Sequence, residues 1–157
     1  MIGTALNNSQ IDEKNAVVND LIKKQFNAAT PENIMKSALI HPKWDTYNFT
    51  MADKLVEYGE KNNIKINGHT LIWHSQLPNF IRGIKSSDSI RTFFTDHIKT
   101  VAGRYKGKVF SWDVVNEALN EDGTLRNSVF LKHLGEGYLV DAFRLAQEAS
   151  PKTELYY

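Results

Sequence analysis

Short apolar runs alternate along the chain with longer stretches whose apolar residues recur at helical spacing. The runs predict β-strands at residues 2–6, 26–29, 64–73, 109–115 and 153–157. The longer stretches predict helices at residues 11–24, 49–62, 86–105 and 129–150, the last interrupted near Gly135 and Gly137. Ser87 or Asp88 is the expected cap of the third helix. The alternation predicts an α/β fold with parallel strands and right-handed helical crossovers.

Polar side chains follow three of the predicted strands. The run at 109–115 is apolar on both faces, as in a buried parallel strand, and ends in Asn116 and Glu117. Glu32 and Asn33 follow the strand at 26–29, and His69 to Gln76 span the end of the strand at 64–73. Because α/β proteins bind ligands at the carboxyl ends of parallel strands, we expect these groups on one face.

Composition excludes several classes of protein. The 157 residues are 41% hydrophobic and 24% charged, which is typical of a globular domain, and the sequence shows no internal domain boundary. The net charge of +1 gives no footprint for nucleic acid, and no run of about 18 apolar residues predicts a membrane span. The absence of cysteine excludes disulfides, thiolate metal sites and a cysteine nucleophile.

Glu117 is the strongest catalytic candidate. A carboxylic acid at the end of a rigid strand can donate a proton to a leaving oxygen, and its carboxylate can later take a proton from water. Asn116 beside it could bind a substrate hydroxyl. The alternative interpretation of Glu117 is a solvated loop acid or a helix cap, which is common for a bare Asn-Glu pair.

Aromatic and basic side chains near these strand ends are candidates for substrate binding. Trp44, Trp73 and Trp112 are the only tryptophans, and aromatic faces stack on the apolar faces of sugar rings. Each of them, taken singly, also fits a place in the core. Lys36 could bind a substrate oxygen, although a solvated lysine is the simpler interpretation.

His69 and His74 do not predict a metal site. Their spacing of five does not match the helical histidine pair of a zinc protease, and no third ligand has a suitable spacing. His69 is better interpreted as a hydrogen-bond donor to substrate or as the partner of an acid. The chain also lacks Gly-rich phosphate loops and the GxSxG elbow, so nucleotide binding and serine hydrolysis have no support.

Three blocks of sequence resemble glycoside hydrolase family 10, the endo-β-1,4-xylanases. They are FNAATPENIMK (26–36), GHTLIWHSQLP (68–78) and WDVVNEAL (112–119). The resemblance extends from Ile2 to the end of the chain. It implies a (β/α)8 TIM barrel, of which this chain holds about four βα units and strand five, and hydrolysis of xylan with retention of configuration.

The resemblance also implies roles for single residues. Glu117 corresponds to the general acid/base, and Asn116 to the residue that binds the sugar 2-hydroxyl near the scissile bond. The implied residues of the glycone side are Glu32, Asn33, Lys36, His69, Trp73 and Gln76. The implied partner is β-1,4-xylan or its oligosaccharides, and no metal or organic cofactor is implied.

The nucleophile of the family is absent from these residues. Retaining hydrolysis needs two carboxyl groups about 5 to 5.5 Å apart, and the family places its nucleophile on the seventh strand. Glu154 lies at the start of the last predicted strand, which is the wrong end of the barrel. Asp113 lies inside its strand, at a position where the family has an acid that is not the nucleophile.

We therefore expect the N-terminal portion of a longer catalytic domain. A barrel of this kind has about 250 residues, and a half-barrel leaves two strand edges and an inner face uncovered, so it should self-associate or pair with its missing half. The isolated chain is predicted to be inactive or nearly so. Alternatives are a non-catalytic half-barrel that binds xylo-oligosaccharides and a related enzyme for another β-linked glycan. Export is expected for a polymer substrate, although residues 1–10 show no signal peptide pattern.

Overall fold

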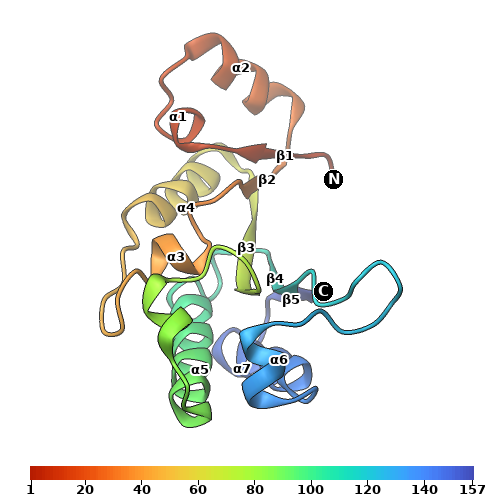
Figure 1. Cartoon of the computed structure of the whole chain (residues 1–157). Helices are drawn as coiled ribbons and strands as arrows, with labels where there is room; N and C mark the ends of the chain where they lie inside the picture. The colour runs from red at the N-terminus through yellow and green to blue at the C-terminus, as the bar shows by residue number, and fades with distance from the viewer.

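Five parallel strands form one sheet in the computed structural model, which describes residues 1–157 (Figure 1). The strands lie in the order β1-β2-β3-β4-β5, so each strand pairs with its neighbour in sequence. Their bounds are β1 Gly3–Leu6, β2 Ala28–Pro31, β3 Lys65–Trp73, β4 Ser111–Asn116 and β5 Glu154–Tyr156. The predicted α/β order of parallel strands is confirmed.

The helices lie in the connections between the strands. They are α1 Asn8–Ile11, α2 Ala16–Gln25, α3 Ser37–Ile40, α4 Thr50–Asn62, the 3-10 helix η1 Asn79–Gly83, α5 Ser87–Arg104, α6 Val129–Leu134 and α7 Tyr138–Ala149. In Figure 1, α1 and α2 lie beside β1 at one end, and α5, α6 and α7 gather at the other. Apolar residues of the sheet and of α4, α5 and α7 form one continuous core.

Three local predictions were wrong. The single helix expected at 11–24 is two helices, because Asn7 and Asn15 each cap a separate helix and Glu13 adopts a left-handed φ of 53° between them. The strand expected at 26–29 is shifted to Ala28–Pro31, since β2 takes its register from β1, and residues 30 and 31 are therefore not loop. Ser86, not Ser87 or Asp88, caps α5 by accepting a hydrogen bond from the Ser89 amide. The interruption near Gly135 and Gly137 is confirmed.

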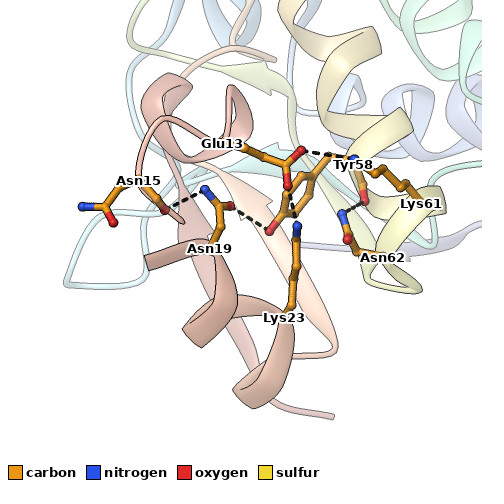
Figure 2. Close-up of polar contacts among 7 residues, drawn as sticks. All are labelled: Glu13, Asn15, Asn19, Lys23, Tyr58, Lys61 and Asn62. Carbon is orange, nitrogen blue, oxygen red and sulfur yellow. Dashed lines mark hydrogen bonds and ion pairs between the residues drawn. The ribbon is translucent and has the colours of Figure 1, made fainter. Parts of the chain in front are cut away.

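A polar cluster fastens α2 and the turn before it to α4 (Figure 2). Glu13 pairs with Lys23 of α2 and lies 3.3 Å from Nζ of Lys61 on α4. The hydroxyl of Tyr58 on α4 donates to Asn19 Oδ1 of α2 at 3.3 Å. These contacts join the helix of the first βα unit to the helix of the next, while β1 and β2 pair directly with each other.

Trp112 lies in the core and not in the site. Its side chain is fully buried, and its ring lies 6.4 Å from that of Tyr105 at the end of α5. The Trp112 ring covers Gly68 on the neighbouring strand so closely that a Cβ at Gly68 would lie 2.1 Å from it. The glycine therefore lets the two strands pair while the indole fills the space between sheet and helices.

β1 and β5 are the two edges of the sheet, which does not close. Apolar side chains are exposed along both edges, including Ile2 at 64%, Tyr156 at 48% and Tyr157 at 63%. The arrangement corresponds to part of a (β/α)8 barrel. The longest helix, α5, and all the others are too short or too polar to span a membrane.

Candidate active site

The pairing of β3 with β4 brings Trp73 beside Glu117. Trp73 lies opposite Asn116 in the parallel register, at the carboxyl ends of both strands. Glu117 follows Asn116, and its Oε2 accepts a hydrogen bond of 2.9 Å from the Trp73 indole nitrogen. The Glu117 side chain is about half exposed. The carboxyl group is therefore held in place by an aromatic residue and remains open to a ligand.

Asn33 is the centre of a second group of side chains at the same edge. Its Oδ1 accepts hydrogen bonds from Lys36 Nζ at 2.9 Å and from Gln76 Nε2 at 3.3 Å. The Lys36 ammonium also lies 4.7 Å from the centre of the Trp73 ring. Contacts thus run without a break from Asn33, through Lys36 and Trp73, to Glu117.

Asp113 on the neighbouring strand holds the side chain of His69. The two residues are opposite each other in the β3–β4 register, and His69 Nδ1 lies 2.8 Å from Asp113 Oδ2. The same oxygen accepts a hydrogen bond of 3.1 Å from Asn67, whose own Oδ1 accepts one of 2.7 Å from Ser111. This network fixes the His69 ring. The sequence analysis allowed an acid partner for His69 but missed Asn67, although its spacing of two places it on the same strand face.

Two of the candidate residues have left-handed backbones. φ is 52° at Glu117 and 45° at Gln76, a region that costs side chains other than glycine of order 1 kcal/mol or more. At Gln76 the carbonyl accepts a hydrogen bond of 2.9 Å from the Ala38 amide. Both turns direct the side chains at the point where a strand opens into a loop.

Arg126 holds the backbone of Glu117, and the sequence analysis did not identify it. Its Nε donates to the Glu117 carbonyl at 2.9 Å, and a terminal nitrogen donates to the Leu119 carbonyl at 3.1 Å. The loop between them also forms an antiparallel bridge between Leu119 and Leu125. A guanidinium nine residues downstream of Glu117 gives no periodic signal, so only the folded loop reveals the contact.

His74 is a second neighbour of the Glu117 carboxylate. Its Nε2 is 3.9 Å from Glu117 Oε2, and its Nδ1 is buried without a hydrogen-bond partner. Burial, together with the positive charge of Arg126, lowers the pKa of His74, and the charge of Glu117 opposes this only in part. His74 is therefore predominantly neutral near pH 7.

Two predicted residues lie at the site without a side-chain hydrogen bond or ion pair. Asn116 is half-buried at the end of β4, and Glu32 is exposed directly after β2. Their roles stay predictions. No group of three or more His, Asp or Glu side chains is arranged to hold a metal ion.

Comparison with known protein families identifies the family of the chain. The family model described as glycosyl hydrolase family 10 matches residues 1–157. The chain belongs to glycosyl hydrolase family 10. The resemblance seen in the three sequence blocks is therefore confirmed. Two curated relatives of this family 10 chain are endo-1,4-beta-xylanase 2 of Claviceps purpurea and endo-1,4-beta-xylanase 3 of Hypocrea jecorina, each 46% identical.

Solved structures confirm the partial barrel. Native xylanase 10B of Thermotoga maritima superimposes with a TM-score of 0.94 at 44% identity, covering 99% of this chain and 48% of that one. Xylanase 10B of Thermotoga petrophila, solved in complex with xylobiose, gives 0.93 at 45% identity, with coverages of 99% and 48%. The Claviceps and Hypocrea matches cover 88% and 98% of this chain but 43% and 44% of those relatives. The family 10 chain thus spans about half the length of the proteins it matches.

Proposed function

We propose that this chain is the acid/base half of a retaining endo-β-1,4-xylanase. The observation that carries the proposal is the position of Glu117 at the end of β4, bonded to Trp73 and next to the Asn33 group. The xylanase names of the relatives, and the xylobiose complex of one structural neighbour, support xylan as the substrate. Export from the cell would follow from a polymeric substrate.

Glu117 acts in both steps of the proposed reaction. As a carboxylic acid it gives its proton to the glycosidic oxygen, while a second carboxylate attacks the anomeric carbon and forms a glycosyl ester. As a carboxylate it then takes a proton from water, whose oxygen displaces the ester and restores the nucleophile. Proton and sugar are thus transferred in two balanced steps.

The second carboxylate lies outside these 157 residues in this proposal. Glu154 pairs with Ser111 at the amino-terminal end of β4, whereas Glu117 lies beyond its carboxyl end. Asp113 already accepts hydrogen bonds from His69 and Asn67. The chain alone should therefore bind substrate and hydrolyse it little or not at all.

The glycone-side residues have matching chemistry. Trp73 offers an apolar face for a sugar ring, and Lys36, Asn33, Gln76 and His69 offer polar groups for its hydroxyls. Asn116 and Glu32 complete the proposed set. Because these groups are in place without the nucleophile, a non-catalytic half-barrel that binds xylo-oligosaccharides is the second candidate function, and a β-glycanase for another glycan is a variant of the first.

Calorimetry and a hydrolysis assay together test the proposal. Xylo-oligosaccharides should give heat of binding with the chain at millimolar sugar, weaker for Trp73→Ala, and the chain should release almost no reducing sugar from xylan. Absence of binding contradicts the glycone site. Sustained hydrolysis by the pure chain that is abolished by Glu117→Gln contradicts the absence of a nucleophile. Tighter binding of cello-oligosaccharides would overturn the choice of xylan.

A further inference from the structure

A cavity of about 530 Å³ lies beside the proposed sugar site, between the segment that follows β3 and the start of α6. His74 and Gln76 line it, and both also adjoin the candidate site, His74 next to Glu117 and Gln76 bonded to Asn33. Its volume is within the range of small-molecule sites. The cavity is therefore a side extension of the region where the polysaccharide backbone would lie.

The charged side chains that line the cavity are all basic. Arg82 comes from η1 and Lys132 from α6, and no aspartate or glutamate lines the cavity. Neither of these two cations takes part in an ion pair of the chain. Two uncompensated cations facing one cavity attract an anion, and a carboxylate suits both.

The remaining lining suits a sugar ring. His74 contributes its ring to the lining, while its Nδ1 is enclosed by the protein. His133 lies 3.2 Å from the Ser87 hydroxyl, which orients its ring. A third of the lining residues are hydrophobic, the set being Leu77, Ile81, Ile84 and Val129. An anion with an apolar face and several hydroxyls fits this mixture better than a small inorganic ion.

We propose that this cavity binds a sugar carboxylate, namely a uronic acid side group carried by the polysaccharide whose backbone contacts Trp73 and Gln76. The assignment of the side group rests on the proposed function, because the backbone must lie on the candidate site for its branch to reach the cavity. The cavity would then favour acidic, branched substrate over the plain polymer. Free uronic acid has the same chemistry and is distinguished in the test.

The test compares two xylo-oligosaccharides of equal length, one plain and one with a single glucuronic acid branch, by calorimetry with the 157-residue chain. Because hydrogen bonds to charged groups are worth about 1.5–3 kcal/mol, the branched sugar should bind about tenfold or more tightly. Arg82→Gln combined with Lys132→Gln should abolish this gain and leave binding of the plain sugar unchanged. The gain should also shrink as salt is added.

A matched control separates the effect of the two cavity cations from the effect of the net charge of the chain. Lys24→Gln combined with Lys106→Gln changes the net charge equally at two exposed lysines outside the cavity, and it should keep the gain. Equal binding of plain and branched sugars, or a gain that survives in the Arg82/Lys132 variant, would overturn the proposal. If no oligosaccharide binds, the proposed function fails. Titration with free glucuronate then tests the cavity alone. Binding that is lost in the Arg82/Lys132 variant supports a carboxylate site in the cavity, and absence of binding overturns it.

Discussion

Arg126 holds the backbone turn that carries Glu117. Its guanidinium joins two carbonyls across the left-handed turn at Glu117, and it is the one side chain that bonds the backbone there. Arginine can do this because its donors form a rigid fork, whereas lysine is a single point charge. The sequence block identifies Glu117 as a candidate. The Arg126 contact that orients it cannot be predicted from the sequence, because it forms only when the loop folds back on itself.

Replacing Arg126 should loosen the loop after β4. In Arg126→Ala both hydrogen bonds to the Glu117 and Leu119 carbonyls are lost, so hydrogen exchange should become at least tenfold faster at Asn120, Gly123 and Thr124, whose amides donate hydrogen bonds within this loop. Arg126→Lys should restore only part of the protection. Arg82→Ala is the matched control, since Arg82 makes no ion pair, and it should change nothing in this loop. Unaltered exchange in Arg126→Ala would contradict the role.

His97 makes the stability of the fold depend on pH. It is fully buried, and its Nδ1 lies 3.3 Å from that of the buried His41. Burial, with a smaller contribution from His41, lowers the pKa of His97 to about 3, well below the value of 6.5 expected when unfolded. As the pH falls through 6.5 the unfolded chain binds the proton first, so the free energy of unfolding decreases from pH 6.5 down to about 3.

Urea denaturation between pH 4 and 7 measures this effect. The free energy of unfolding should fall by up to about 1.4 kcal/mol per pH unit for this one histidine. In His97→Gln the group that titrates is gone while a hydrogen-bond donor to His41 is kept, so the decline should be shallower below pH 6.5. Identical slopes for the two proteins would show that His97 does not cause it.

At the scale of elements, the sequence predicted the strands and helices that have a regular apolar pattern. It missed the boundaries that depend on helix capping or on strand register. The five strands, their parallel order and the break in the last helix followed from apolar periodicity and glycine. The division into α1 and α2 did not, because the side chains of Asn7 and Asn15 each start a helix against the apolar pattern. The contact of His69 with Asp113 also needed the β3–β4 register, which depends on both strands at once.

Gly68 tests the packing between β3 and β4. Gly68→Ala places a methyl group 2.1 Å from the Trp112 ring, so the indole must move within a filled core, at a cost of about 1–3 kcal/mol or more. Gly103→Ala in α5 is the control. Nothing lies within 4 Å of its new methyl group, and alanine in a helix is favoured by up to about 1 kcal/mol. Thermal unfolding should show opposite shifts; a neutral Gly68→Ala would refute the packing.

At the scale of the whole molecule, the two edges of the sheet differ from its polar face in how well their hydrogen-bonding groups are satisfied. β1 and β5 each leave one row of backbone groups without a strand partner, while Asn67, Ser111 and Asp113 satisfy one another on the sheet face that also carries His69. The edges, not the face, are thus the surfaces where a complementary half or a second copy would pair. In the proposed function only a complementary half would complete the site, because a second copy of this chain also lacks the nucleophile.

Completion of the site is therefore the most direct measurement. The 157 residues are joined to the remaining half of Thermotoga maritima xylanase 10B, to which this chain is 44% identical, and hydrolysis is measured on xylan and on an aryl xyloside with a good leaving group. We predict activity on both substrates. Glu117→Gln should lower kcat/KM on xylan by about 10²–10⁴-fold and change kcat/KM on the activated substrate far less, because that substrate needs no acid to depart. The second step, which loses its general base, should become slow on the activated substrate and give a burst of the released phenol. An equal loss of kcat/KM on both substrates, or no loss on xylan, would contradict Glu117 as the general acid/base.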